Sequence, residues 1–158
     1  MQRYRISGKP EDEINGRNST VVKARDSQTG EFVAIKIRSP LGKEEDAKTA
    51  WKAHWECAKR EADFLRTLKE QGFPEKVGVQ TFIDSYADDK ATDIAHYLVT
   101  KWVEGEDLQK YLEREGALTH AQIHSIVRQV LLTIKEAHAL NPKIVHRDIK
   151  PSNVRIRF

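Results

Sequence analysis

The 158-residue sequence lacks the features of secreted and membrane-spanning proteins. It has one cysteine, Cys57, which cannot form a disulfide within the chain, and this favours a reducing compartment. Its first segment, MQRYRISGKPEDEI, has no apolar core of the kind found in secretory signals. No run approaches the ~18 apolar residues that a membrane-spanning helix needs. We therefore expect a cytoplasmic protein without a membrane partner.

An excess of charge of either sign is also missing. The 27 lysines and arginines are mixed with 24 aspartates and glutamates, so the net charge is only +3. Because nucleic-acid-binding proteins normally carry a concentrated basic face, we expect no nucleic-acid partner. The histidines and the cysteine do not have the spacing of a zinc site. The oligomeric state stays open.

Local patterns predict a hairpin followed by a long helix. The β-branched runs TVVKARD and EFVAIKIR are separated by SQTG, whose Gly30 suits a tight turn. Residues 43–71 contain neither proline nor glycine, which predicts a helix that ends at QGFP. The apolar residues that fall on one face of this helix are Trp51, Trp55, Ala58, Ala62, Leu65 and Leu68.

The rest of the chain predicts two more strands and two helices. VGVQTFIDSY and AHYLVTKWV are the strand candidates, and EDLQKYLERE is a short helix. Thr119 is expected to cap a longer helix that ends at Asn141-Pro142. The apolar stripe of that helix consists of Ile123, Ile126, Val127, Val130, Leu131, Ile134 and His138. Strands concentrated early and helices late predict an α+β fold.

The segment richest in chemical groups is HRDIKPSN, residues 146–153. It places Asp148, Lys150 and Asn153 on one short loop, which Pro151 stiffens. A carboxylate can orient a hydroxyl proton, a lysine can neutralise a transferring phosphoryl group, and a side-chain carbonyl can bind Mg²⁺. The alternative is an accidental charged turn, but six specified residues at fixed spacing argue against it.

A second motif, VAIK, ends in Lys36 on a predicted strand. Glu61, in KREADFL on the long predicted helix, can pair with this lysine and fix it where it can hold phosphates. The alternatives are a solvated lysine at the end of a strand and an exposed helix charge. We favour the pair because Lys36, Glu61 and Asp148 occur in the same order as in the family that these motifs resemble.

With these two motifs the sequence resembles a eukaryotic-type protein kinase domain, from about Tyr4 onward. Lysine two places after the aspartate is similar to the serine/threonine branch, and YLVTKWVEGEDL resembles the strand and hinge between the two kinase lobes. The resemblance implies an N-terminal lobe and hinge over residues 1–103, with a twisted antiparallel sheet and one long helix. Residues 104–158 would form the first helices and catalytic loop of the helical C-terminal lobe.

The resemblance also implies phosphoryl transfer from Mg-ATP to serine or threonine hydroxyls of proteins. Asp148 would orient the substrate hydroxyl, Lys150 would lie near the γ-phosphate, and Asn153 would be both a catalytic residue and the metal ligand. Lys36, paired with Glu61, would hold the α- and β-phosphates. The other cofactor-binding residues that the resemblance implies are Gly16, Val21, Ala34, Thr100, Lys101, Val103 and Asp107.

These residues have different implied roles. Val21 and Ala34 would pack against the faces of adenine, and Thr100 occupies the gatekeeper position. The backbones of Lys101 and Val103 would form hydrogen bonds to adenine. Asp107 would reach the ribose.

The family's glycine-rich loop is degraded in this sequence. With Val21 as its closing valine, the three glycine positions fall on Ile14, Gly16 and Ser19, and only Gly16 is retained. Glycine lets backbone N–H groups approach phosphate without an intervening side chain. We therefore expect weakened phosphate contacts, with Lys36 and any metal taking a larger share.

The Asp-Phe-Gly motif and the activation loop of the family do not follow NVRIRF in this sequence. We therefore expect a partial catalytic domain, truncated after the catalytic loop and inactive alone. One alternative is a non-catalytic pseudokinase that binds nucleotide or a partner protein. A small-molecule phosphotransferase is the other, although such enzymes usually lack the Lys150-Pro151 arrangement.

Overall fold

The computed structural model describes residues 3–8, 13–15, 19–38, 45–73, 78–87, 96–141 and 143–157, with only the backbone described for 13, 15 and 45–54. The chain forms two compact units. The sheet unit comprises Met1–Gly72 and Gln80–Trp102, and the helical unit comprises Phe73–Val79 and Val103–Phe158. None of the helices among the described residues combines the length and the apolar character that a membrane span requires.

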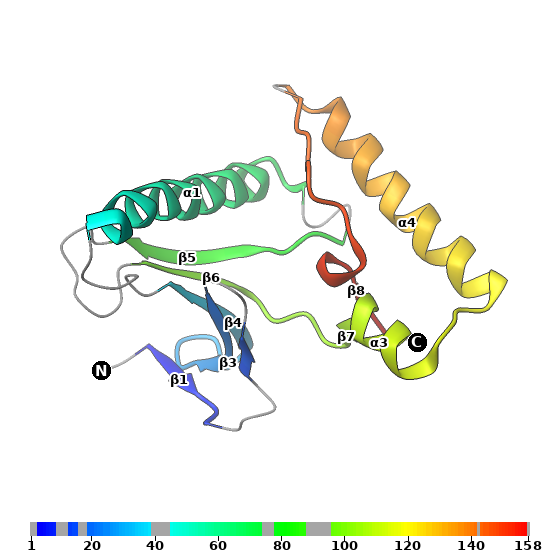
Figure 1. Ribbon diagram of the computed structural model, residues 1–158, viewed down its shortest axis with the longest axis horizontal. Helices are drawn as coiled ribbons and strands as arrows, with labels where there is room; N and C mark the ends of the chain where they lie inside the picture. The colour runs from blue at the N-terminus through cyan, green and yellow to red at the C-terminus, as the bar shows by residue number, and fades with distance from the viewer. Residues whose placement is uncertain are drawn as a thin grey trace. The chain divides into compact units, whose positions relative to one another are not determined.

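The sheet unit is built on a six-stranded antiparallel sheet in the order β1-β3-β4-β6-β5, with β2 paired to β3 (Figure 1). The predicted hairpin is present, and Gly30 in its turn has a φ of 75°. The sequence patterns did not predict β1, which has only three residues. The strands are β1 (Tyr4–Ile6), β2 (Glu13–Asn15), β3 (Thr20–Asp26), β4 (Phe32–Arg38), β5 (Phe82–Ala87) and β6 (His96–Lys101).

Alternation along the strands gives the sheet two different faces. One face buries a core of Val22, Ala24, Val33, Ile35 and Val99. The opposite face carries Lys36 and Arg38 of β4, which lie across from Leu98 and His96 of β6. The strand register therefore brings charged side chains together on the second face.

Helix α1 (Glu45–Glu70) contacts β5 and β6 of the sheet unit and runs along β5 in Figure 1. The long helix predicted from the sequence is confirmed. The apolar face is also confirmed, because Ala58, Ala62, Leu65 and Leu68 are buried and Trp55 is half-buried. The side chain of Trp51 lies outside the described residues.

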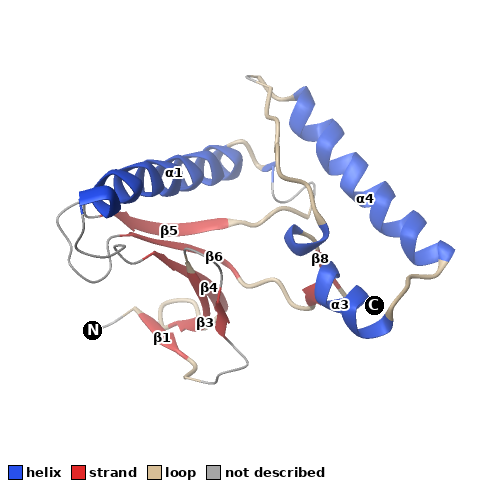
Figure 2. Ribbon diagram, viewed as in Figure 1, coloured by secondary structure: helices blue, strands red, loops and turns tan. Residues whose placement is uncertain are grey.

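The described residues of the helical unit include helices α3 and α4, a short ladder and one turn of 3₁₀-helix (Figure 2). Thr119 caps α4 as predicted, and the side chain of Gln122 accepts a hydrogen bond from the Thr119 N–H to complete a capping box. The elements are β7 (Glu106–Asp107), α3 (Leu108–Glu115), α4 (His120–Ala139), the 3₁₀-helix η2 (Pro151–Asn153) and β8 (Arg155–Ile156).

Helix α4 carries the predicted apolar stripe, but none of its residues is buried. Ile123, Val127 and Leu131 are all exposed, and Leu131 is the most exposed of them at 59%.

Strand β8 pairs with β7 close to Gly105, which has a φ of 105°. A Cβ at Gly105 would clash with the Ile156 carbonyl oxygen, so this approach requires glycine.

Candidate active site

The sheet unit contains an ion pair between Lys36 of β4 and Glu61 of α1. The Lys36 Nζ lies 2.7 Å from Oε1 and 3.0 Å from Oε2 of Glu61. The side chains of Lys36 and Glu61 are 31% and 32% exposed, so the pair is only partly removed from solvent. The ion pair predicted from VAIK and KREADFL is therefore present, with a lysine that solvent can still reach.

Sequence reasoning missed a second cation on the same carboxylate. Arg38 donates from Nη2 to Glu61 Oε2 at 2.9 Å. Burial of Glu61 raises the pKa of its carboxyl group, but Lys36 and Arg38 outweigh this effect and lower the pKa below its ordinary value. The sequence did contain a signal for this contact, because residues two apart on a strand lie on the same face, and Arg38 follows Lys36 by two.

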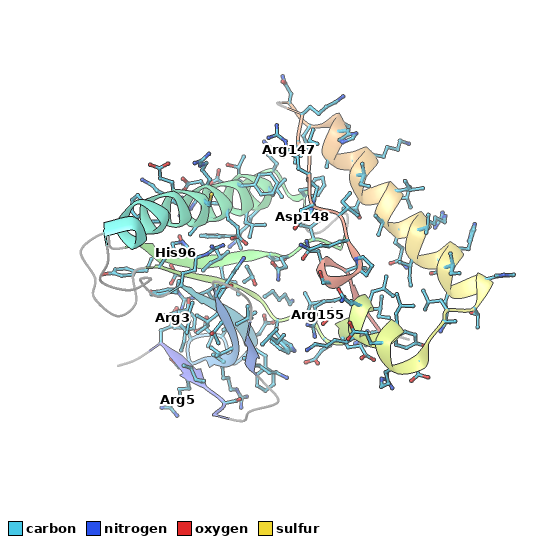
Figure 3. The ribbon with its side chains drawn as sticks, viewed as in Figure 1. Arg3, Arg5, His96, Arg147, Asp148 and Arg155 are labelled. Atoms are coloured by element: carbon cyan, nitrogen blue, oxygen red, sulfur yellow. The ribbon has the colours of Figure 1, made fainter. Side chains whose placement is uncertain are left out.

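His96 of β6, labelled in Figure 3, lies directly across from Arg38 of this cluster in the strand register. The side chain is buried, with 1% of its surface exposed. Burial, followed by the charges of Arg38 and Lys36, lowers the pKa of His96, while Glu61 opposes the shift. The imidazole is therefore kept neutral at neutral pH.

The same face of the sheet holds the residues expected to contact adenine. Val21 lies across from Lys36, and Ala34 lies across from Thr100. Ala34 and Thr100 are buried, and Val21 is half-buried. Gly16, the retained glycine of the expected phosphate loop, lies outside the described residues.

Two backbone N–H groups that follow Thr100, the expected gatekeeper, donate hydrogen bonds within the sheet unit. Lys101 donates from its N–H to the Thr81 carbonyl at 2.9 Å, and Trp102 donates to the Phe32 carbonyl at 3.2 Å. Lys101 can therefore offer adenine its carbonyl but not its N–H. Val103, the other expected hinge residue, begins the second segment of the helical unit and is exposed.

The helical unit gathers the three residues of the HRDIKPSN loop. Asp148 Oδ2 lies 3.0 Å from Lys150 Nζ and accepts a 2.9 Å hydrogen bond from Asn153 Nδ2. Asn153 Nδ2 also donates to the backbone carbonyl of Asp148 at 2.8 Å. The hydrogen bond from Lys150, followed by that from Asn153, lowers the pKa of Asp148. The exposed Asp148 is therefore an oriented carboxylate at neutral pH.

The backbone of this loop explains how these side chains meet. Arg147 has a φ of 64°, which turns the chain immediately before Asp148. His146 Nδ1 accepts from the Asp148 N–H at 3.3 Å, and Asn153 N–H donates to the Lys150 carbonyl at 2.9 Å. Figure 3 labels Arg147 and Asp148, which follow one another along the segment after α4.

Comparison with known proteins identifies the family. The family described as "Protein kinase domain" matches residues 14–157 of this chain. The chain belongs to the protein kinase domain family. The lysine-glutamate pair and the HRDIKPSN loop thus both lie within a kinase domain.

Relatives of this kinase domain include three named protein kinases. RAD53, a serine/threonine-protein kinase of Saccharomyces cerevisiae, is 31% identical over 92% of this chain. Serine/threonine-protein kinase tousled-like 2 of Xenopus tropicalis is 30% identical over 88%, and mitogen-activated protein kinase 12 of Danio rerio is 33% identical over 89%. The chain spans 16%, 18% and 35% of those three proteins, respectively.

A solved structure of a relative confirms the fold of the kinase domain. The crystal structure of Rad53 1–466 in complex with AMP-PNP is similar with a TM-score of 0.68 and 28% sequence identity. The similarity covers 98% of this chain and 34% of the Rad53 chain. The α+β, protein-kinase-like fold and the serine/threonine kinase family predicted from the sequence are both confirmed.

Asp107 of the kinase domain has a structural use in addition to its expected contact with ribose. Its Oδ1 accepts from the Lys110 N–H at 2.8 Å, which caps α3, and its side chain is half-buried. Asp107 was predictable as a cap from its position before LQKYLERE. Its second carboxylate oxygen lies 3.9 Å from Lys110 Nζ.

Asn153 has a side-chain oxygen that fits the metal expected in kinase domains. Its Nδ2 is fixed on Asp148, so its Oδ1 points the other way and is a hard oxygen of the type that Mg²⁺ prefers. Within the described ranges, no three His, Cys, Asp or Glu side chains gather as a metal cluster. The fit therefore rests on the Asn153 Oδ1.

Proposed function

We propose that the protein is a cytoplasmic serine/threonine kinase that transfers the γ-phosphoryl group of Mg-ATP to hydroxyl groups of protein substrates. The observation that carries this proposal is the cluster of Asp148, Lys150 and Asn153, because it places an oriented carboxylate beside a cation and an amide oxygen. The named serine/threonine kinases among its relatives support the choice of substrate class.

Each residue of the kinase domain contributes binding, orientation or charge. Lys36 would bind the α- and β-phosphates while Glu61 keeps its ammonium group in place. The Asp148 carboxylate would accept a hydrogen bond from the substrate hydroxyl and orient it, because its lowered pKa keeps it ionised. Lys150 would place positive charge near the transferred group. Asn153 would hold Mg²⁺, which supplies further charge neutralisation when bound.

The remaining expected residues would bind the nucleoside. Val21 and Ala34 offer apolar contacts to the adenine faces, and Thr100 lies at the gatekeeper position of the same face. Lys101 would offer its carbonyl and Val103 its backbone. Asp107 would use the carboxylate oxygen that does not cap α3 to accept from a ribose hydroxyl.

The test measures ATP binding by the purified chain and turnover by the chain joined to the family's Asp-Phe-Gly and activation-loop segments. We expect ATP binding that strengthens with Mg²⁺, and phosphorylation of serine and threonine peptides and not of tyrosine peptides by the joined protein. Asp148→Asn should abolish transfer while leaving ATP binding intact. Asp63→Asn, an exposed change on α1, is the matched control. Transfer to a metabolite instead of a peptide would support a small-molecule phosphotransferase and contradict the proposal.

A binding module without turnover is a second candidate, favoured by one observation. Ile14, which lies across from Val21, and Ser19 stand where the family has glycines. Their side chains would keep backbone N–H groups away from phosphate. Mg²⁺-sensitive ATP binding without transfer to any peptide, by a chain that includes all the segments its relatives use, would favour this candidate.

A further inference from the structure

One carboxylate in the sheet unit holds two cations from a single strand. Lys36 contacts both oxygens of Glu61, and Arg38 donates to Oε2 at 2.9 Å. Arg38 is the most buried of the three side chains, with 15% of it exposed. The second cation is therefore the more restricted partner of Glu61.

The spacing of the two cations fixes the helix along the strand. Residues two apart on a strand are separated by about 6.6 Å on the same face. A carboxylate that contacts both Lys36 and Arg38 can lie at only one place along β4. A contact with Lys36 alone would be looser, because its four-carbon stem lets the ammonium group follow a sliding or rotating helix. The planar guanidinium of Arg38 allows less of this movement.

We propose that Arg38 is a positioning residue for nucleotide binding, which holds Oε2 of Glu61 so that α1 and the Lys36 ammonium stay in place. This inference rests on the proposed function, in which Lys36 binds phosphates. Arg38 acts through Glu61 and does not itself touch the nucleotide. When Lys36 turns one of its hydrogens toward phosphate, Glu61 keeps a charged partner and α1 keeps its attachment to β4.

The surroundings of Arg38 favour this role over that of a solvated charge. His96, its register partner on β6, is fully buried beside it and lies near the charges of Lys36, Arg38 and Glu61. Within the described residues, the Arg38 Nε is buried without a hydrogen-bond partner. The guanidinium is thus oriented by its bond to Glu61, with protein packed around the rest of it.

An exposed arginine on α1 provides the matched comparison. Arg60 Nη2 lies 3.4 Å from Glu56 Oε2, one turn away, and the Arg60 side chain is 74% exposed. Pairs of this kind contribute little, because solvent screens them and both side chains are mobile. Arg60→Met therefore removes the same chemical group as Arg38→Met without removing an attachment of α1 to the sheet.

The experiment compares the affinities of ATP and adenosine by titration calorimetry for the wild-type chain, Arg38→Met, Arg38→Lys and Arg60→Met. We expect Arg38→Met to weaken ATP binding by about tenfold and to leave adenosine binding within about twofold. Arg38→Lys keeps the charge but loses the planar fork, so an intermediate loss is expected. Arg60→Met should match the wild type for both ligands.

Hydrogen exchange of α1 amides around Glu61, measured without nucleotide, is the second arm. Arg38→Met should speed this exchange, and Arg60→Met should not. Equal losses for ATP and adenosine, unchanged affinities, or tighter ATP binding in Arg38→Met would each overturn the proposal. If the wild type binds neither ligand, the proposed nucleotide binding fails, and unchanged α1 exchange in Arg38→Met would then overturn the inference as well. If Arg38→Met does not fold, Arg38→Lys carries both measurements.

Discussion

Asp26 and Glu61 are two carboxylates on opposite faces of the sheet, and each is held by an arginine. Asp26 is 1% exposed and accepts from Arg3 Nη2 at 2.9 Å and from the Gln28 N–H at 2.9 Å. Glu61 is 32% exposed and is shared by Lys36 and Arg38. Both carboxylates have a lowered pKa, in Asp26 chiefly because of the hydrogen bond from Arg3.

The two clusters differ in what their cations can still reach. The guanidinium of Arg3 contacts two carboxylates, because it also donates to Asp84 Oδ2 at 3.4 Å. Tyr4 donates to the same oxygen of Asp84 at 3.0 Å. This network ties β1 to β3 and β5. Lys36, in contrast, is 31% exposed and has a third ammonium hydrogen beyond its two contacts to Glu61. We call the cluster of Arg3, Asp26 and Asp84 the closed network, because its cation is fully used and it can only stabilise the fold. The cluster of Lys36, Arg38 and Glu61 is the open cluster, because its lysine can still bind a ligand.

Asp26→Asn tests the closed network and should have the largest effect on stability. The amide keeps the shape but removes the charge that Arg3 faces, and its NH₂ group adds a donor where donors already converge. We expect the thermal unfolding midpoint to fall by several degrees. The ratio of ATP to adenosine affinity should stay unchanged, because Glu61 is untouched.

Calorimetry gives the midpoint and titration gives the affinity ratio. Asp63→Asn, which removes an exposed carboxylate that pairs with Arg66, is the control and should leave both quantities near their wild-type values. An Asp26→Asn chain with the wild-type midpoint would show that the buried network does not stabilise β1.

Lys36→Met tests the open cluster and should weaken ATP binding while leaving stability nearly unchanged, the opposite of Asp26→Asn. The lost charge-assisted hydrogen bonds should weaken ATP binding by more than about tenfold and leave adenosine binding nearly unchanged. The unfolding midpoint should change little, since Arg38 still pairs with Glu61. The matched control is Lys69→Met, in the last turn of α1. Equal weakening of ATP and adenosine would contradict a phosphate-binding role for Lys36.

The pH dependence of stability should separate His96 from Glu61. Burial first, and then the Arg38 charge, lowers the pKa of His96 from its ordinary value of 6.5. Below about pH 6.5 the unfolded chain binds a proton at His96 that the folded chain does not, so the free energy of unfolding falls as the pH falls. Because the pKa of Glu61 is lowered from its ordinary value of 4.5, the free energy of unfolding should fall a second time as the pH drops below that value.

Denaturant unfolding between pH 7.5 and 5, chosen around the ordinary histidine pKa of roughly 6.5, would measure the first loss. His96→Gln should flatten this part of the curve, and His138→Gln, an exposed change on α4, should not. An unchanged slope in His96→Gln would show that the buried imidazole does not titrate differently in the folded chain. Direct proton NMR titration of His96 gives the same answer if the variant is unstable.

Much of the fold was predictable because its signals are local. The β3–β4 hairpin follows from two β-branched runs and Gly30, and α1 from a long segment without proline or glycine. The cap of α4 follows from Thr119 and Gln122, three residues apart. These features depend on neighbours in the sequence, which a reader of the sequence can see.

The rest depended on pairings between distant segments. Arg3 meets Asp26 only because β1 pairs with β3, and the three residues of β1 carry no recognisable pattern. His96 is buried because its strand is central, between β4 and β5. Lys36 and Glu61 were predictable from kinase motifs, but Arg38 lies outside those motifs although it holds the same carboxylate. Sheet register, not composition, assembled these clusters.

The predicted degradation of the glycine-rich loop gives the test with the smallest expected effect. Replacing Ile14 and Ser19 by glycine should tighten ATP binding by about threefold, because backbone N–H groups could approach phosphate without a side chain intervening. Adenosine binding should not change. Ser27→Gly, in the turn between β3 and β4, is the control for an added glycine elsewhere in the sheet unit.

The double glycine variant should also be slightly less stable, since glycine loses more conformational freedom on folding than isoleucine or serine. A gain in ATP affinity that accompanies a lower unfolding midpoint would assign the gain to the loop, because a general stabilisation of the fold would raise both. If ATP binding does not tighten, the alignment that places Val21 at the end of the loop is wrong. Lys36 would then be the main phosphate contact of the sheet unit, and its pair with Glu61 would carry phosphate recognition on that side.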